Sequence, residues 1–138
     1  MRSRAGAVII KDGKILLMHR FKNGEEYFVF SGGGIKEGET PEMTAIRELK
    51  EEMNIDIVLD RLLIKIVDKF GNDGTYFLAK SFTGDPKLSG EEKERMNENN
   101  QYYPVWLDLQ EALKLDNLYP HEVRDKLSDL YLPEVKAT

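Results

Sequence analysis

The chain has 138 residues, of which 41% are hydrophobic and 33% charged, a composition typical of an ordinary folded domain rather than a disordered or fibrous chain. At this length roughly two-thirds of the unfolded chain's surface can be buried, so stability requires neither disulfides nor a structural metal. Twenty lysines and arginines against twenty-five aspartates and glutamates give a net charge of −5, which argues against binding a nucleic acid polymer through a basic face. We therefore expect a single domain over residues 1–138.

The sequence contains no cysteine, so zinc–thiolate sites, thiol nucleophiles and disulfide frameworks are excluded. Its first apolar stretch, residues 5–10, ends at Lys11-Asp12 and is too short for a signal-peptide core or a membrane span. We expect a cytoplasmic protein with no membrane partner.

Strand patterns open the chain. Residues 5–10 and 14–20 are apolar runs on either side of Lys11-Asp12-Gly13, and an Asp-Gly pair between such runs favours a tight turn. The pattern predicts an antiparallel hairpin. Residues 27–30 are aromatic and β-branched, which predicts a third strand, and the Ser31–Gly34 segment that follows predicts the start of a loop.

A helix is expected from about residue 40. Thr40 is a good N-cap, Pro41 suits the first helical position, and Asn54 can adopt the left-handed conformation that ends a helix after Met53. One apolar arc of this helix is expected to face the core; its members are Ala45, Ile46, Leu49 and Met53.

The second half of the chain alternates between strand and helix patterns. Residues 55–67 indicate one strand or two, and the turn composition of residues 71–74 predicts that they form a hairpin with residues 75–79. The polar stretch 83–101 is expected to be a long loop or a short helix. The remaining elements are expected to be a strand over residues 102–107 and helices over residues 108–115 and 120–130.

The helix over residues 40–54 carries three closely spaced glutamates. By helical geometry, Glu52 lies about 70° from the centre of the apolar arc, Glu48 about 110° on the same side, and Glu51 almost opposite the core. Like charges spaced as Glu48 and Glu52 are repel each other. A divalent cation would resolve the repulsion, because Mg²⁺ and Mn²⁺ prefer carboxylate and carbonyl oxygens, and the preceding glycines can bring a bare carbonyl to the same ion. The alternative is a solvated acidic face with an Arg47–Glu51 pair.

The segment from Gly33 to Ile55 resembles the signature of the Nudix hydrolases: Gly, five residues, Glu, seven residues, then Arg-Glu-apolar-any-Glu-Glu-any-Gly-apolar. One fixed position departs, because Asn54 replaces the last Gly; Asn is the next best left-handed cap, so the change affects helix termination more than chemistry. Ser31 stands where the family usually has Pro. The matching fixed positions are Gly33, Glu39, Arg47, Glu48, Glu51 and Glu52.

The resemblance implies an α+β fold, a single α/β/α sandwich with a mixed central sheet. It implies one or more Mg²⁺ (or Mn²⁺) ions surrounded by the Gly32 carbonyl and by Glu48, Glu51 and Glu52, with Glu39 supporting the loop and helix. The resemblance further implies that Glu48, Arg47 and Glu51 form the catalytic set, with Glu48, held in place by Arg47, as the usual general base. Some relatives take the base or a further metal ligand from a later loop. Here that residue would be Glu98, Glu94 or Glu91, for which the alternative is a solvated loop.

Two arginines are candidates for substrate binding. Arg4 and Arg20 lie on the first two predicted strands and could meet a diphosphate, the alternative being unpaired surface arginines. Four aromatic residues could stack on a base, although aromatic residues in strands are more often part of the core. They are Tyr27, Phe28, Tyr76 and Tyr103.

The resulting hypothesis is a Mg²⁺-dependent pyrophosphohydrolase that cleaves the diphosphate bridge of a nucleoside diphosphate linked to another group, by water attack on phosphorus. The alternative is a non-catalytic Nudix-like module that senses a nucleotide or sugar nucleotide. The expected partner is a small-molecule nucleotide, and because many relatives are dimers a homodimer is expected. Residues 70–73 carry no marker of a particular substrate.

Overall fold

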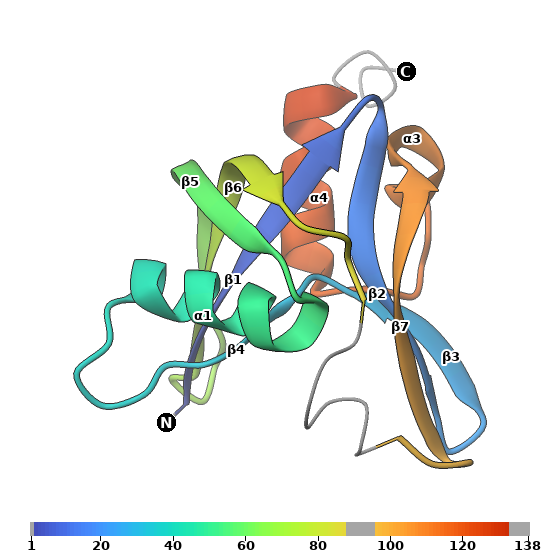
Figure 1. Cartoon of the computed structure of the whole chain (residues 1–138), viewed down its shortest axis with the longest axis horizontal. Coiled ribbons are helices and arrows are strands. Elements are labelled where there is room, and N and C mark those ends of the chain that lie inside the picture. Colours follow the sequence, from blue (N-terminus) through green and yellow to red (C-terminus); the bar gives the residue numbers. More distant parts are fainter. Residues whose placement is uncertain (1, 88–95, 133–138) are drawn as a thin grey trace.

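Eight strands form one mixed sheet in the computed structural model, which describes residues 2–87 and 96–132 (Figure 1). The order along the sheet is β5-β6-β1-β2-β3-β8, with β4 paired to β1 and β7 paired to β2. The β1–β6 and β3–β8 pairs are parallel and the others antiparallel. The strands are β1 (Ser3–Lys11), β2 (Lys14–Lys22), β3 (Glu25–Val29), β4 (Gly32–Gly34), β5 (Asp56–Val67), β6 (Asp73–Thr83), β7 (Asn100–Asp108) and β8 (Leu118–Tyr119), and the helices are α1 (Pro41–Met53), α3 (Leu109–Ala112) and α4 (His121–Tyr131).

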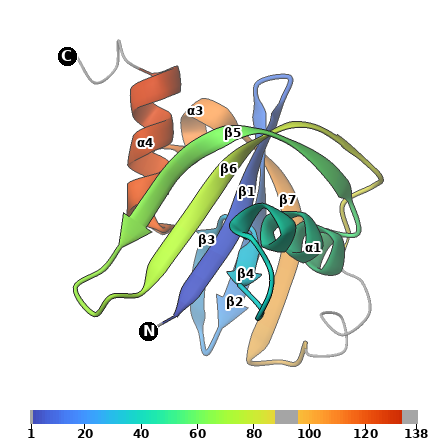
Figure 2. The same ribbon diagram turned by 90° about the vertical axis from the view of Figure 1, so that its left-hand side faces the viewer.

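Helices cover both faces of this sheet, with α1 on one face and α3 and α4 on the other (Figure 2). The side chains of β2 alternate between the two layers, as the pleat of a strand requires. Ile15 and Leu17 belong to the apolar cluster that includes α4, whereas Leu16 and Met18 belong to the cluster that includes α1. The predicted α+β sandwich with a mixed sheet is confirmed. No described helix has the length and apolar character needed to cross a membrane.

The two predicted hairpins are confirmed. Lys11 pairs with Lys14 at the β1–β2 turn, and β5 pairs antiparallel with β6. Residues 56–67 form one strand rather than two, because bulges near Leu59 and Leu62 bend it without interrupting the pairing.

The predicted limits of α1 are confirmed. The Oγ1 of Thr40 accepts a hydrogen bond from the backbone N–H of Met43, and Asn54 ends the helix in the left-handed conformation with φ of 60°. The predicted core arc is wrong at one position. Ile46 is 42% exposed, whereas Thr44 is buried, because α1 turns Thr44 toward the loop that precedes the helix, where its hydroxyl bonds Glu39.

Other predicted elements need correction. The glycines after Ser31 form strand β4 rather than a loop, since they pair with the start of β1. The helix expected over residues 108–115 is only Leu109–Ala112, with the Asp108 side chain as its N-cap. Pro120 is the N-cap of α4 rather than its first helical residue, because Tyr119 just before it is held in β8 alongside β3.

Candidate active site

Three glycines allow the backbone of β4 to lie close against β1 and α1. Gly6 of β1 pairs with Gly32 of β4, and a Cβ on Gly32 would overlap the Ala5 carbonyl oxygen and the Gly6 Cα. A Cβ on Gly33 would overlap the carboxylate of Glu48. Neighbouring backbone therefore requires glycine at Gly32, whereas at Gly33 the absence of a Cβ leaves room for the Glu48 carboxylate.

Arg47 is the centre of an ion-pair network at the middle of α1. Its Nε and Nη2 donate to the two carboxylate oxygens of Glu39 at 2.7 and 2.9 Å. Its Nη1 donates to Glu48 at 2.8 Å and to Glu51 at 3.1 Å, and its Nη2 also reaches the Gly34 carbonyl at 3.0 Å. The side chain is only 20% exposed. The Arg47–Glu51 pair of the alternative interpretation is thus present, but as one part of a larger network.

Glu39 ties the segment before α1 to the helix. Besides the bidentate pair with Arg47, its carboxylate accepts hydrogen bonds from the Lys36 backbone N–H and the Thr44 hydroxyl, each at 2.9 Å. These donors stabilise the ionised form, and the hydrogen bonds from Arg47 contribute most, so the pKa of Glu39 falls from 4.5 to about 2. Through these contacts Glu39 connects the preceding segment to α1; the family resemblance implies a supporting role at this position.

Glu52 lies one turn beyond Glu48 and meets a residue that the sequence analysis did not single out for chemistry. The buried Ser31 hydroxyl donates a hydrogen bond of 2.5 Å to the Glu52 carboxylate. The carboxylate of Glu48 lies against Gly33, which follows Ser31 by two residues. The carboxylates of Glu48 and Glu52 are therefore both held against the segment that contains the glycines, and they lie on the same side of α1, as the helical geometry predicts.

The chemistry of these donors fits a hard divalent cation. Two carboxylates and the Gly32 carbonyl are the oxygen ligands that Mg²⁺ and Mn²⁺ prefer, and the absence of a Cβ at Gly33 leaves the Glu48 carboxylate access to that backbone. Glu51 is exposed and turned to Arg47. Within residues 2–87 and 96–132, no three carboxylate or histidine side chains already form a metal-ligand group.

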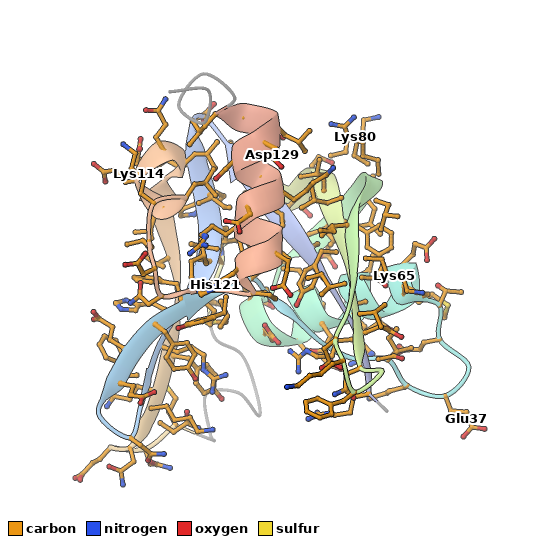
Figure 3. All side chains as sticks on the ribbon, turned by 180° about the vertical axis from the view of Figure 1, so that it is seen from behind. Glu37, Lys65, Lys80, Lys114, His121 and Asp129 are labelled. Carbon is orange, nitrogen blue, oxygen red and sulfur yellow. The ribbon has the colours of Figure 1, made fainter. Side chains whose placement is uncertain are left out.

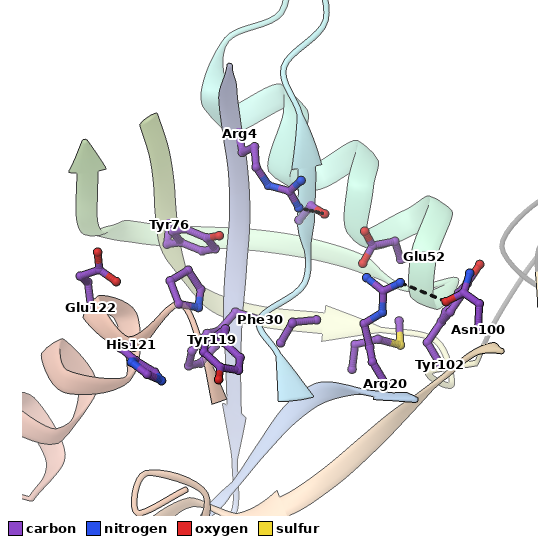
Figure 4. Close-up of a pocket in the computed structure, with 14 residues that line it drawn as sticks. Arg4, Arg20, Phe30, Glu52, Tyr76, Asn100, Tyr102, Tyr119, His121 and Glu122 are labelled. Atoms are coloured by element: carbon purple, nitrogen blue, oxygen red, sulfur yellow. Dashed lines mark hydrogen bonds between the residues drawn. The ribbon is translucent and has the colours of Figure 1, made fainter. Parts of the chain in front are cut away.

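A cavity of about 680 Å³ lies beside these carboxylates (Figure 4). Glu52 and Gly32 form part of its wall, so the cavity reaches the acidic edge of α1. Its remaining lining comes from strands and from the start of α4, and consists of Arg4, Met18, Arg20, Val29, Phe30, Tyr76, Asn100, Tyr102, Tyr119, Pro120, His121 and Glu122.

Both predicted substrate-binding arginines line this cavity. The Nη2 of Arg4 donates to the Gly32 carbonyl at 3.3 Å. The Nη2 of Arg20 donates to Asn100 at 3.3 Å, and its guanidinium lies 5.3 Å from the ring centre of Tyr102. Among the described residues, the buried Nε of Arg20 has no hydrogen-bond partner. The structure thus brings two cations to the same cavity as Glu52.

Only one of the four aromatic residues that could stack on a base lines the cavity. Tyr76 lines the cavity and is 5% exposed, whereas Tyr27, Phe28 and Tyr103 are not part of its wall. The sequence analysis missed four cavity residues with aromatic rings: Phe30, Tyr102, Tyr119 and His121.

Tyr119 and His121 stack on each other with ring centres 4.7 Å apart, and His121 lies at the start of α4 (Figure 3). The Nε2 of His121 also hydrogen-bonds the Asp116 carbonyl at 2.8 Å, which fixes its ring. The only sequence signal for this group was Pro120 at the predicted start of a helix, because the pairing of β8 with β3 that places Tyr119 at the cavity leaves no local pattern.

Of the three glutamates that the sequence analysis considered in the later loop, the structure describes Glu98, which does not line the cavity. Glu98 is exposed in the turn before β7, two residues from Asn100 in the cavity wall. Glu91 and Glu94 lie outside the residues that the structure describes. The structure therefore does not bring Glu98 to the carboxylates of α1.

Comparison with known proteins identifies a family model and curated relatives that are similar to this chain. A family model described as "NUDIX domain" matches residues 1–127. The dihydroneopterin triphosphate diphosphatases of Escherichia coli (strain K12) and Shigella flexneri are each 33% identical to the chain over 57 residues, which are 41% of this chain but only 38% of the relative. The matched part is thus little more than a third of those relatives.

Solved structures extend the likeness to nearly the whole chain. The MutT NUDIX hydrolase from Burkholderia pseudomallei is 26% identical with a TM-score of 0.68, over 92% of this chain and 95% of that one. The E. coli ORF135 protein has a TM-score of 0.73 at 23% identity, over 96% and 91% of the two chains. A structure of an ADP compounds hydrolase has a TM-score of 0.71 at 19% identity, over 96% and 74%. The last two, at such low identity, establish the fold alone.

Proposed function

Since the chain belongs to the NUDIX family of hydrolases that act on phosphorus anhydrides, we propose that it is a Mg²⁺-dependent pyrophosphohydrolase. Its substrate would be a nucleoside diphosphate linked to another group, and water would attack phosphorus within the diphosphate bridge. The observation that carries this proposal is the cavity in which Glu52 and the Gly32 backbone share a wall with Arg4 and Arg20. The Glu52 carboxylate, suited to a cation, and two arginines, suited to phosphate oxygens, therefore face one space.

In the proposed reaction the acidic edge of α1 supplies both metal ligands and a base. Glu48, Glu51, Glu52 and the Gly32 carbonyl would hold Mg²⁺ or Mn²⁺, which offsets phosphate charge and lowers the pKa of a bound water. Glu48 would accept the proton as the water attacks, and its 2.8 Å hydrogen bond from Arg47 supports this role by fixing the carboxylate.

The arginines and the rings suggest how the substrate would lie. Arg4 and Arg20 would bind the phosphates near Glu52, since guanidinium groups bind phosphate oxygens in pairs of hydrogen bonds. The aromatic ring of the nucleoside would then lie toward the stacked pair of Tyr119 and His121 at the other end of the cavity (Figure 4). A cavity of about 680 Å³ has the size of an ordinary small-molecule site.

The test is a substrate panel with Mg²⁺ or Mn²⁺, in which the masses of both products are measured. The panel should include sugar nucleotides, dinucleotides, nucleoside triphosphates, ADP compounds and dihydroneopterin triphosphate, the last two because similar proteins bear those names. We expect cleavage inside the diphosphate bridge. Binding of a panel compound without turnover would instead support the sensing module.

Several features of the proposal stay predictions. Glu98 as a further metal ligand would require the turn before β7 to approach α1, because the residue is exposed and outside the cavity wall. Cytoplasmic location, a homodimer and a single domain over residues 1–138 are likewise predictions of the sequence. Size-exclusion chromatography with light scattering would test the homodimer.

A further inference from the structure

The guanidinium of Arg4 lies against the carbonyl oxygen that the proposed metal site uses. Arg4 is in β1 opposite Gly34 of β4, and its Nη2 donates to the Gly32 carbonyl at 3.3 Å (Figure 4). This distance exceeds the usual range of about 2.7–3.2 Å for an N–H···O hydrogen bond, so the bond holds Arg4 weakly. The positive charge of Arg4 therefore lies where a metal ion would otherwise approach the backbone.

Arg4 also has neighbours on the cavity side. Burial raises the pKa of the Tyr76 hydroxyl, and the positive charge of Arg4 opposes that rise, whereas Glu52 and Glu122 add to it. Arg4, Glu52, Tyr76 and Glu122 all line the same cavity. A guanidinium that left the Gly32 carbonyl would still have hydrogen-bond acceptors within the cavity.

A divalent cation and a guanidinium cannot both stay beside one carbonyl oxygen at low energetic cost. Their charges repel, and the repulsion is stronger in a partly enclosed cavity than in water. A phosphate group changes this balance, because it carries negative charge and accepts paired hydrogen bonds from arginine. Arg4 thus repels a metal ion that binds alone, but it hydrogen-bonds a phosphate group that binds together with the metal ion.

We propose that Arg4 hydrogen-bonds the Gly32 carbonyl in the metal-free protein and moves to a substrate phosphate when the metal ion binds. Metal and phosphate then strengthen each other's binding through Arg4. This inference rests on the proposed function, because it takes the Gly32 carbonyl as a metal ligand. It goes further in assigning to one side chain the coupling between two ligands.

The test is Mn²⁺ binding to the full chain, measured from the signal of free Mn²⁺ in electron paramagnetic resonance. Binding is measured with Mn²⁺ alone and with imidodiphosphate, a diphosphate analogue whose P–N–P bridge resists hydrolysis. We expect imidodiphosphate to tighten Mn²⁺ binding to the wild type roughly tenfold or more. Arg4→Met should bind Mn²⁺ alone roughly threefold to tenfold more tightly, and the tightening by imidodiphosphate should shrink at least fivefold.

Two further variants serve as controls. Arg2→Met removes the same charge two residues earlier, outside the cavity wall, and should bind Mn²⁺ as the wild type does. Arg4→Lys keeps the charge without the fork of donors and should fall between wild type and Arg4→Met. Thermal melts would show that all variants are folded.

The outcomes separate the two proposals. If Arg4 only supports the Gly32 carbonyl, Arg4→Met should bind Mn²⁺ alone equally or more weakly, and that result overturns the inference while the proposed function stands. Absence of Mn²⁺ binding by every variant would overturn both.

Discussion

At the middle of α1, Glu39, Glu48 and Glu51 share the guanidinium of Arg47, whereas one turn later Glu52 accepts a hydrogen bond from Ser31 and lines the cavity. Both regions involve glutamates of α1, and Glu39 joins the first region from the segment that precedes the helix. The Arg47 network connects the segment before α1 to the helix, and the Glu52 region faces the space where a ligand would lie. Glutamate thus supports structure at Glu39, combines an ion pair with the proposed metal and proton chemistry at Glu48 and Glu51, and lines the cavity at Glu52.

The largest expected effect is on activity at the cavity end. Glu52→Gln should lower Mg²⁺-dependent kcat by about 10³ or more, because a carboxylate ligand is lost. The amide oxygen can still accept the Ser31 hydrogen bond and repulsion with Glu48 is relieved, so the melting temperature should be equal or higher. Steady-state kinetics and calorimetry check both parts. Unchanged activity of Glu52→Gln on any accepted substrate would refute the assignment of the site.

In the Arg47 network, by contrast, substitution is expected to lower the stability of the protein. Arg47→Ala leaves Glu39, Glu48 and Glu51 without their shared cation, so the free energy of unfolding should fall by about 2 to 4 kcal/mol, between the values for exposed and buried ion pairs. Urea denaturation measures the change. Arg47→Lys, which keeps the charge but not the bidentate geometry, should recover only part of it. A loss below about 0.5 kcal/mol for Arg47→Ala would show that the network is not structural.

Gly32 and Gly33 allow a loss of stability and a loss of activity to be compared at adjacent residues. Gly32→Ala places a Cβ on backbone atoms of β1 and should cost about 1 to 3 kcal/mol of stability. Gly33→Ala places its Cβ on the Glu48 carboxylate, the flexible end of a side chain, which can move aside. Gly33→Ala should therefore lower kcat with little change in unfolding free energy. Denaturation and kinetics on the two variants, side by side, would test this; equal stability losses would contradict it.

The smallest expected effect concerns pH. The pKa of Glu39 is about 2 in the folded protein and near 4.5 when unfolded, so its contribution to stability is complete above pH 4.5 and is lost as the pH falls toward 2. Glu39→Gln should be less stable than wild type at pH 7, and the difference between them should narrow between pH 4.5 and 2. Melting temperatures of both proteins across that range check the sign. A difference in melting temperature that stays constant across this range would mean that the pKa of Glu39 is the same in the folded and the unfolded protein.

Local chemistry explains why part of the molecule could be predicted from sequence. Thr40 and Asn54 fix the limits of α1 through hydrogen bonds to nearby backbone, and the spacing of Arg47 and Glu51 pairs them within one helical turn. Arg4 and Arg20, the two substrate-binding candidates on the first two strands, both line the cavity.

The remainder depends on distant contacts. Ile46 is exposed because tertiary contacts, not the apolar arc alone, set the rotation of α1. Tyr102 and Tyr119 meet at one cavity because β7 pairs with β2 and β8 pairs with β3. Ser31 contacts Glu52 across 21 positions of sequence, and no periodic pattern encodes such a meeting.

The strand character of the three glycines in β4 has a consequence for the energetics of recognition. Because Gly32–Gly34 are fixed by pairing with β1, their backbone is already ordered before any ligand arrives. A flexible glycine loop would lose conformational entropy on closing around a phosphate, and that loss would weaken affinity. Here the sheet has met this entropic cost during folding, so discrimination among ligands falls to the side chains around the cavity rather than to closure of the glycine segment.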